Sequence, residues 1–253
     1  MLNTSAGIKC VVFDLDGTVY FGKQLAPHAL EMLAYARQRA GRIFFATNNS
    51  AKTPSEIYQR LRDRGIPLTP DEVITSSLLL TEYLLDKHLT RTITLGTASL
   101  KNFFRQHGID PLSKQAQALV IGYDPDATVR DLDPCLNYLP SDYLFVAANT
   151  ERCYPVENGW LTPGAGALVK MAEFVLQKPA DVLIGKPSPV MLQWIARKLN
   201  LSPQQILMVG DQYASDIVMA EKFGAQALLI TNNTPSDYPC KKAATLAGIK
   251  DLI

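Results

Sequence analysis

Two aspartates separated by one residue, Asp14 and Asp16, directly follow a short apolar run, Cys10–Phe13. A run that is short, rich in β-branched and aromatic residues and apolar throughout indicates a strand buried on both faces of a parallel sheet. Alternate residues of an extended segment point the same way, so both carboxylates would face one side. Gly17 then lets the backbone turn away. Carboxylates placed in this way can carry out nucleophilic and general acid–base chemistry.

Three further apolar runs also end in residues that suit phosphoryl transfer. They are residues 43–46, which lead into Thr47 and Asn48, residues 182–184, which lead to Lys186, and residues 206–209, which lead to Asp211. Ligands of an open α/β sheet bind beyond the carboxyl ends of its strands, so we expect all four endings to meet at one site. Each ending alone is typical of a turn, but four of them on four strands fit one reaction.

That reaction is the transfer of a phosphoryl group. One aspartate of the pair can attack phosphorus and form an aspartyl-phosphate, while its neighbour protonates the leaving oxygen and later activates water. Two carboxylates repel a phosphate dianion unless a cation intervenes, which predicts Mg²⁺ with Asp211 as a further ligand. Asp216, five residues on, would lie close by and either hold a metal-bound water or orient Lys186. Thr47 can donate its hydroxyl to a phosphoryl oxygen, assisted by Asn48 or by backbone amides, and Lys186 offsets the charge that develops on the other oxygens.

Helical segments connect the predicted strands. Apolar residues recur at helical spacing in several stretches, over 29–39, 54–64, 167–176, 189–199 and 215–223, with a short strand and a helix over 71–85 and a last strand over 227–230. The middle of the chain has an alternation of its own, with strands over 92–96, 118–122 and 143–148 and helices over 98–107 and 128–138. This pattern predicts a second, smaller α/β unit. We therefore expect a core domain of residues 1–82 and 181–253 and an inserted domain of residues 83–180.

The composition excludes several classes of function. Lys plus Arg number 25 against 24 Asp plus Glu, which leaves no overall field to attract nucleic acid or an anionic membrane. The four cysteines are widely spaced without a Cys-x-x-Cys pair, a pattern that favours free thiols in a reducing compartment. No apolar stretch has the length of a spanning helix, and the first ten residues lack the pattern of a secretory signal. We expect a cytoplasmic protein that binds neither nucleic acid nor membranes.

The chain resembles the haloacid dehalogenase superfamily in four motifs, which here are Asp14-Leu15-Asp16-Gly17-Thr18, Thr47-Asn48-Asn49-Ser50, Gly185-Lys186-Pro187 and Gly210-Asp211 with Asp216. The Thr-Asn-Asn-Ser form is typical of the NagD-like phosphatases of this superfamily. Residues 120–124, and Pro155 followed by residues 163–167, are also similar to that subgroup. The resemblance spans nearly the whole chain.

The resemblance implies a Rossmann-like α/β core, with a parallel sheet flanked by helices, and a smaller inserted α/β cap domain that covers the site. It implies that Asp14 is the nucleophile and Asp16 the general acid and base. The remaining assignments that it implies are Mg²⁺ held by Asp14, Asp211 and the carbonyl of Asp16, and a phosphoryl group bound by Thr47, Asn48 and Lys186. The cap is expected to open and close about hinges near residues 80–85 and 178–181, and caps of this subgroup often form homodimers.

Two departures from the subgroup bear on the substrate. The subgroup commonly has Thr-Asn-x-Asp in the cap loop, where this chain has Ala148-Asn149-Thr150-Glu151, and Thr-Asp where this chain has Ser215-Asp216. The second exchange is chemically mild. The first lies in the loop expected to face the leaving group, so it concerns the identity of the substrate and not the reaction. Sugar phosphates, nucleotides and other small phosphorylated metabolites all fit.

We weigh three alternatives to a phosphatase. A dehalogenase has no leaving oxygen to protonate and no dianion to neutralise, so it would not need the combination of Asp16 and Asp211. A phosphomutase would need the cap to exclude water and return the phosphoryl group, a property that the sequence neither shows nor forbids. A phosphate-ligand sensor or scaffold would tolerate Asn or Ser at position 14, whereas this chain keeps every group that turnover requires.

Overall fold

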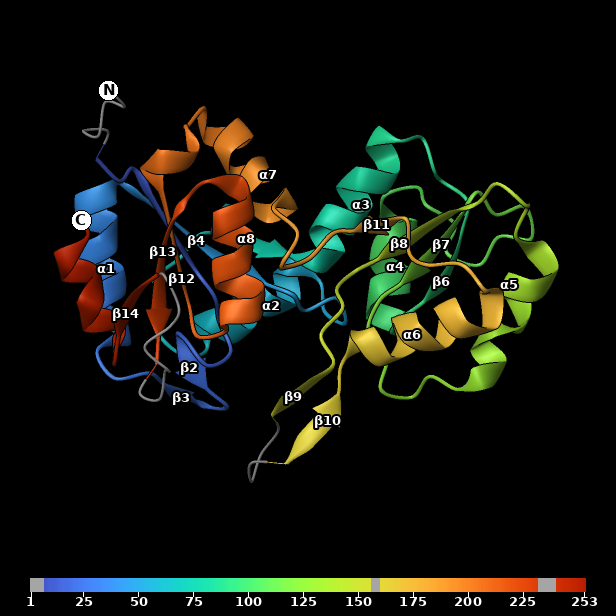
Figure 1. Ribbon diagram of the computed structural model, residues 1–253, viewed down its shortest axis with the longest axis horizontal. Coiled ribbons are helices and arrows are strands. Elements are labelled where there is room, and N and C mark those ends of the chain that lie inside the picture. The colour runs from blue at the N-terminus through green and yellow to red at the C-terminus, as the bar shows by residue number, and fades with distance from the viewer. Residues whose placement is uncertain (1–6, 156–159, 232–239) are drawn as a thin grey trace. The chain divides into compact units, whose positions relative to one another are not determined.

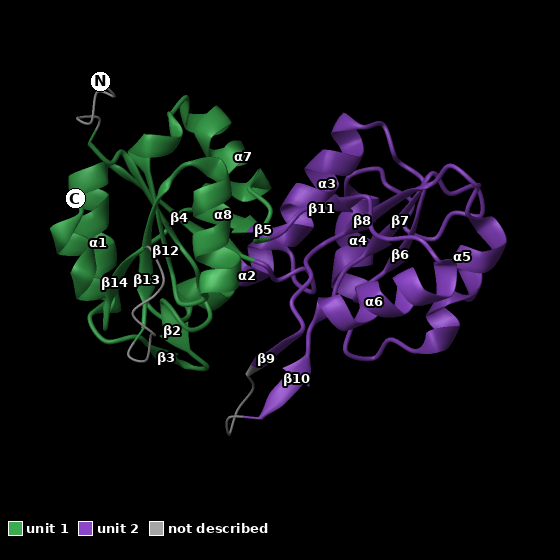
Figure 2. Ribbon diagram, in the orientation of Figure 1, with its two compact units in different colours: residues 1–47, 58–74, 186–253 green, residues 48–57, 75–185 purple. Residues whose placement is uncertain are grey.

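The computed structural model describes residues 7–155, 160–231 and 240–253. It divides into two compact units, shown in green and purple in Figure 2. Unit 1 comprises residues 1–47, 58–74 and 186–253, and unit 2 comprises residues 48–57 and 75–185. The domain boundaries at 82–83 and 180–181 stay a prediction. The hinge expected at residues 80–85, however, lies within the continuous helix α3 (Ser76–Asp86), which leaves no loop there to absorb a change of backbone angles.

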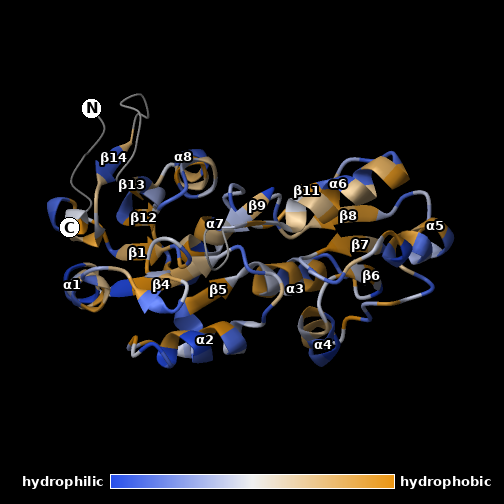
Figure 3. Ribbon diagram, turned by 90° about the horizontal axis from the view of Figure 1, so that it is seen from below, coloured by the Kyte–Doolittle hydropathy of each residue, from blue (hydrophilic) through white to orange (hydrophobic). Residues whose placement is uncertain are grey.

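Unit 1, labelled in Figure 1, is built on a sheet whose described strands follow the order β14-β13-β12-β1-β4-β5, which Figure 3 shows from below. Their bounds are Lys241–Ala243, Gln226–Ile230, Ile206–Gly210, Cys10–Phe13, Arg42–Thr47 and Val73–Thr75. The pairings of β1 with β4 and β12, and of β13 with β12 and β14, are parallel. Every residue of β1 and β12 is buried, as expected for central strands covered on both faces.

Helices cover both faces of this sheet. Figure 3 shows α1 (Ala29–Ala40) on one face and α7 (Val190–Leu199) and α8 (Val218–Phe223) on the other. Gly41 ends α1 with a φ of 78°, a left-handed conformation that glycine adopts without steric cost. The shorter helical segments are η1 (Pro70–Glu72), η4 (Pro203–Gln205), the π-helical η5 (Tyr213–Ile217) and η6 (Leu246–Asp251), and α2 (Pro54–Arg62) spans the boundary between residues 57 and 58.

Unit 2 contains a second sheet, with its described strands in the order β11-β8-β7-β6 and all pairings parallel. The strands are Val182–Leu183, Leu144–Ala147, Ala118–Ile121 and Thr92–Leu95, and the helices are α3, α4 (Ala98–Gln106), η2 (Val129–Leu132), α5 (Asp133–Tyr138) and α6 (Ala165–Leu176). A core that includes Leu119, Phe145 and Val169 joins the sheet to α6. Figure 3 shows α3 and α4 on the opposite face.

The α/β class, with parallel sheets flanked by helices, is confirmed. One strand prediction is wrong in its partner, because β11 pairs with β8 of unit 2 and not with the core sheet. Two hairpins were not predicted, namely β2 (Tyr20–Phe21) with β3 (Gln24–Leu25) and β9 (Cys153–Pro155) with β10 (Leu161–Pro163). All four cysteines are free thiols, as predicted.

Candidate active site

The register of the core sheet brings three of the predicted strand endings to one edge. Phe13 of β1 is paired with Val209 of β12 on one side and with Phe45 of β4 on the other. The three strands therefore end close to the same level of the sheet, with Asp14 directly after β1, Asp211 directly after β12 and Thr47 as the last residue of β4. The alignment arises because all three strands are parallel and apolar on both faces, so their polar residues begin where burial ends.

A buried lysine joins two carboxylates at this edge. The Lys186 ammonium donates to Oδ1 of Asp14 and, at 2.7 Å, to Oδ1 of Asp216, and the exposed fractions of the three residues are only 3, 6 and 1%. The second oxygen of Asp216 accepts the backbone N–H of Gln212 at 3.1 Å. Lys186 also lies 3.5 Å from the carbonyl of Ala46, which adjoins Thr47. Lys186 thus contacts residues at the ends of β1 and β4, although the strand that precedes it, β11, belongs to the other sheet.

The charges at this edge do not balance, because three carboxylates share one ammonium. Burial raises the pKa of the Asp14 carboxyl well above its ordinary value, although the nearby charge of Lys186 lowers it, and repulsion from Asp216 and Asp211 adds to the rise. Burial alone would lower the pKa of Lys186, but the charges of Asp14 and Asp216 raise it. Burial together with Asp216 raises the pKa of Asp211 to about 6, against a hydrogen bond of 3.0 Å from the Thr18 hydroxyl.

Two glycines make room for these carboxylates. A Cβ atom on Gly17 would lie 2.3 Å from Oδ2 of Asp211, and Gly17 also has a φ of 95°. A Cβ on Gly210 would lie 2.3 Å from Oδ2 of Asp216. Any side chain at either position would displace an acidic group, so the glycines after Asp16 and before Asp211 serve the close approach of the carboxylates as well as the turn of the chain.

One carboxylate oxygen each of Asp14, Asp211 and Asp216 lies within 4.8 Å of the others. These are hard oxygen donors with an excess of negative charge, which a divalent cation such as Mg²⁺ would neutralise. The residues therefore fit the predicted metal. Both oxygens of Asp216 already have protein donors, which leaves Asp14 and Asp211 as the carboxylates better able to bind an ion.

Asp16 lies outside this cluster. Its side chain is 58% exposed, whereas Asp14 two residues earlier is buried. Oδ2 of Asp16 accepts a hydrogen bond from the Tyr20 hydroxyl at 3.0 Å, and Oδ1 lies 3.5 Å from Nη2 of Arg60. Asp14 and Asp16 thus both follow the same strand, β1. Their carboxylates nevertheless contact different residues.

Asn48 belongs to unit 2, where it forms a clasp with the loop that departs from the subgroup. Its side-chain amide donates to Oε1 of Glu151 at 2.8 Å, and its backbone carbonyl accepts the Asn149 side-chain amide at 2.9 Å. Asn149 Oδ1 in turn accepts the backbone N–H of Glu151 at 3.1 Å. The backbone N–H of Gly185 also donates to the carbonyl of Ala148 at 2.7 Å. The same loop thus holds the residue after Thr47 and the residue before Lys186.

Sequence reasoning missed three residues that contact the predicted ones. Thr18 stands within the quoted first motif, yet no role was derived for it, and Tyr20 follows two residues later. Arg60 lies on α2, more than forty positions from Asp16, and no spacing in the sequence signals their contact. A hydroxyl close to an acidic pair could have identified Thr18, but only the fold reveals Arg60.

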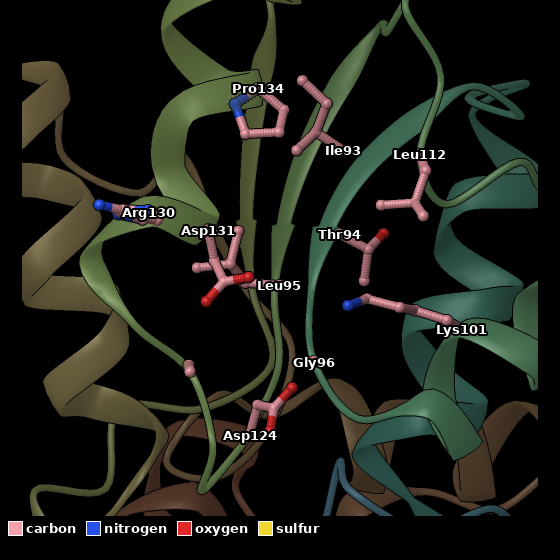
Figure 4. Close-up of a pocket in the computed structure, with 11 residues that line it drawn as sticks. Ile93, Thr94, Leu95, Gly96, Lys101, Leu112, Asp124, Arg130, Asp131 and Pro134 are labelled. Carbon is pink, nitrogen blue, oxygen red and sulfur yellow. The ribbon is translucent and has the colours of Figure 1, made fainter.

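The described residues also form a cavity of about 120 Å³ within unit 2, shown in Figure 4. Lys101, Asp124 and Asp131 are among the residues that line it, and it lies beside Leu95 and Gly96 at the end of β6. None of the predicted site residues lines this cavity. Its mixed charges indicate no single ligand, so we do not place the reaction there.

The chain is similar to known hydrolases. Two family models match the chain, a haloacid dehalogenase-like hydrolase model over residues 11–110 and a related hydrolase-like model of the same family over residues 183–249. An acid sugar phosphatase of Staphylococcus haemolyticus is 30% identical over 87% of this chain and 84% of its own length. The human glycerol-3-phosphate phosphatase is 28% identical over 94% of this chain and 86% of its own. A solved structure of a nagD protein is 26% identical, covers 100% of this chain and 99% of its own, and has a TM-score of 0.88.

Proposed function

The chain belongs to the haloacid dehalogenase-like hydrolases, within their NagD-like subgroup, and we propose that it is a Mg²⁺-dependent phosphatase that hydrolyses a small phosphomonoester through an aspartyl-phosphate. A phosphatase is the enzyme class to which its family and relatives assign it. The observation that best supports Mg²⁺ dependence and an aspartyl-phosphate is the buried contact of Lys186 with both Asp14 and Asp216, beside Asp211. These groups combine a nucleophile, a phosphate-binding cation and an acidic metal site.

In the first step, a carboxylate oxygen of Asp14 attacks phosphorus, the new O–P bond forms, and the bond from phosphorus to the leaving oxygen breaks. Asp16 supplies a proton to that oxygen, so the leaving group departs as a neutral alcohol. In the second step, Asp16 as carboxylate accepts a proton from a water whose oxygen attacks phosphorus. Inorganic phosphate is released and the Asp14 carboxylate is restored. Lys186 remains charged throughout and offsets the negative charge on the phosphoryl oxygens.

Mg²⁺, when bound by Asp14, Asp211 and the carbonyl of Asp16, would supply charge neutralisation for the substrate dianion. Each residue near this metal site has its own role in the proposed mechanism. Thr18 orients Asp211 through its hydroxyl, and Asp216 orients Lys186. Thr47 would donate to a phosphoryl oxygen. Because the Asn48 side-chain amide already binds Glu151, we assign phosphoryl contact at that position to the backbone and the side chain to the clasp.

The substrate in this proposal is a small phosphorylated metabolite, such as a sugar phosphate, a nucleotide or a glycerol phosphate. Support comes from the names of the two relatives and from the even balance of charge, with 25 basic and 24 acidic residues. The same balance supports the proposal that the protein binds neither nucleic acid nor membrane surfaces. Among residues 7–155, 160–231 and 240–253, no helix combines the length and the apolar character that crossing a membrane demands. A cytoplasmic location and a homodimer complete the proposal.

We further propose that residues 83–180 act as a cap on a core of residues 1–82 and 181–253. The clasp of Asn48 with Glu151 and the hydrogen bond of Gly185 with Ala148 tie one cap loop to residues adjacent to Thr47 and Lys186. A movement of that loop would therefore be transmitted to both ends of the phosphoryl-binding machinery. Because helix α3 runs unbroken from Ser76 to Asp86, hinges at residues 74–75 and 185–186 are better placed than residues 80–85, and they would move residues 75–82 and 181–185 together with the cap.

Release of phosphate from p-nitrophenyl phosphate, measured with and without Mg²⁺, tests the proposal. We expect turnover with Mg²⁺ and its loss after chelation, with recovery when Mg²⁺ is restored. A panel of phosphorylated metabolites assayed under the same conditions would then identify the substrate. Pure, folded protein without metal-dependent turnover of any phosphomonoester would contradict the proposal and favour a sensor that binds phosphate ligands without cleaving them.

A further inference from the structure

Two side chains that the mechanism above does not use, those of Tyr20 and Arg60, contact the carboxylate of Asp16. The Tyr20 hydroxyl donates to Oδ2 at 3.0 Å, and Nη2 of Arg60 lies 3.5 Å from Oδ1. Each oxygen of Asp16 therefore has a donor of its own. We propose that Tyr20 and Arg60 are positioning residues that fix Asp16 in the orientation from which it exchanges protons with the leaving group and with water. This inference rests on the proposed function.

Asp16 needs such support because its surroundings provide little else. Its side chain is 58% exposed, so packing alone does not select one rotamer. An acid or base catalyst must lie within hydrogen-bond reach of the proton it transfers, and small displacements reduce the rate strongly. Two donors that approach from different elements restrict both the side-chain rotation and the plane of the carboxylate.

Tyr20 is suited to this task because its own position is fixed. The residue is fully buried, and its backbone carbonyl accepts the N–H of Gly17 at 2.9 Å, which closes the turn that follows Asp16. Burial and the charge of Asp16 raise the pKa of the Tyr20 hydroxyl, so the phenol keeps its proton and acts as a donor. A single substitution, Tyr20→Phe, would remove this donor and leave the packed ring in place.

Arg60 is held against the same ring. Its guanidinium carbon lies 4.9 Å from the centroid of the Tyr20 ring, and that of Arg64 lies 4.6 Å away. Arg64 donates to the carbonyl of Arg60 at 2.9 Å and to that of Gly22 at 2.8 Å, which ties helix α2 to the β2–β3 turn. Arg60, with its side chain 29% exposed, is thus placed by the ring stack beside Asp16.

The experiment compares two substrates of nearly the same shape, phenyl phosphate and p-nitrophenyl phosphate. Phenolate leaves poorly without a proton, whereas p-nitrophenolate is stable without one at neutral pH. The kcat/KM value reports the steps up to the first irreversible one, here the formation of the phosphoenzyme. If Tyr20 and Arg60 position Asp16, then Tyr20→Phe and Arg60→Gln should lower kcat/KM for phenyl phosphate about tenfold or more, and lower it much less for p-nitrophenyl phosphate.

Matched controls are available in the same unit. Tyr35→Phe removes a phenol hydroxyl that donates to the carbonyl of Ile253 at 3.2 Å, and Arg62→Gln removes an exposed guanidinium from the same helix as Arg60. Both controls should leave the ratio of the two kcat/KM values at its wild-type level. The ratio does not depend on how much of a preparation is folded. Arg60→Lys keeps the charge but lacks the planar guanidinium. It should restore the ratio of the two kcat/KM values only part of the way from the Arg60→Gln value to the wild-type value.

The outcomes separate the inference from the function on which it rests. Wild-type protein that hydrolyses neither substrate would contradict the proposed phosphatase itself. Active wild type with an unchanged substrate ratio in both Tyr20→Phe and Arg60→Gln would overturn the positioning role alone. Faster turnover of phenyl phosphate in these variants would also overturn it, because the two residues would then hold Asp16 in a resting orientation.

Discussion

Nζ of Lys186 lies 2.7 Å from Oδ1 of Asp216, and both side chains are almost fully buried, with exposed fractions of 3 and 1%. Breaking a buried ion pair leaves an uncompensated charge and usually destabilises a protein by several kcal/mol. We therefore expect Lys186→Met, which leaves the buried carboxylates of Asp14 and Asp216 without their ammonium partner, to lower the free energy of unfolding by about 3 kcal/mol. Urea denaturation measures this change.

The control for this prediction is an exposed ion pair in the same unit. Lys250 and Glu31 approach to 3.1 Å with side chains 48 and 59% exposed, so Glu31→Gln should change the urea midpoint little. If Lys186→Met were as harmless as Glu31→Gln, the buried pair would not be the organising contact that we describe.

Binding of Mg²⁺ should stabilise the folded protein, because an ion that binds only the native state adds free energy by mass action. At a concentration 100 times its dissociation constant, the gain is about 2.7 kcal/mol. Asp211→Asn should abolish most of the rise in melting temperature produced by Mg²⁺, and the substitution of an exposed acid outside the cluster, Asp63→Asn, should not. Equal shifts in wild type and Asp211→Asn would mean that the metal binds elsewhere.

The clasp within unit 2 gives a prediction on loop stability. Glu151→Ala removes the acceptor that the Asn48 side chain uses at 2.8 Å, and we expect a loss of about 1.5–3 kcal/mol, typical of a hydrogen bond to a charged group. Glu151→Gln keeps an acceptor oxygen and should lose less. Hydrogen exchange of the amides of residues 148–151 would localise the effect. Exchange that is unchanged in Glu151→Ala would show that the clasp does not order this loop.

Asp181 provides a prediction on pH. Burial alone would raise its pKa, but the hydrogen bonds from Lys178, at 2.8 Å, and from the backbone N–H of Phe145, at 2.7 Å, outweigh burial and lower the pKa below its ordinary value of 3.8. Because the folded value is the lower one, Asp181 stabilises the protein above pH 3.8, and this contribution is lost as the pH falls through the folded pKa.

Asp181→Asn should therefore lower the urea midpoint at pH 7, and its difference from wild type should shrink as the pH falls below about 3.8. The size at pH 7 should be modest, on the order of 1 kcal/mol, because the side chain is 35% exposed and water screens the pair. A difference that stays constant from pH 7 to pH 3 would exclude the ionised carboxylate as its source.

Much of the fold could be predicted because its strands are short, apolar and followed by polar residues. The alternation of strands and helices predicted both α/β units, and the endings of β1, β4 and β12 predicted the edge where Asp14, Thr47 and Asp211 lie. Such patterns report burial and period, which are local properties of a chain. Partner choice is not local, so the run that forms β11 indicated a strand but not its pairing with β8.

The rest of the site depends on contacts that no local pattern encodes. The strands of the β2–β3 hairpin are two residues long, too short to show an alternation, and they nevertheless bring Tyr20 to Asp16. Arg60 reaches the same carboxylate from a helix whose sequence shows only ordinary amphipathic spacing. Lys186 was predicted to lie in the same site as Asp14, and it contacts Asp14. The strand that precedes Lys186, however, pairs within the other sheet.

The central claim of the proposed mechanism is that Asp14 carries the phosphoryl group. Asp16→Asn should slow the release of phosphate and trap the phosphoenzyme, so mass spectrometry of that variant after brief exposure to substrate and Mg²⁺ tests the claim directly. We predict one added phosphoryl group, located on Asp14 by peptide mapping, and none in the double variant with Asp14→Asn. Phosphate on another residue, or undiminished turnover in a folded Asp14→Asn protein, would contradict the account.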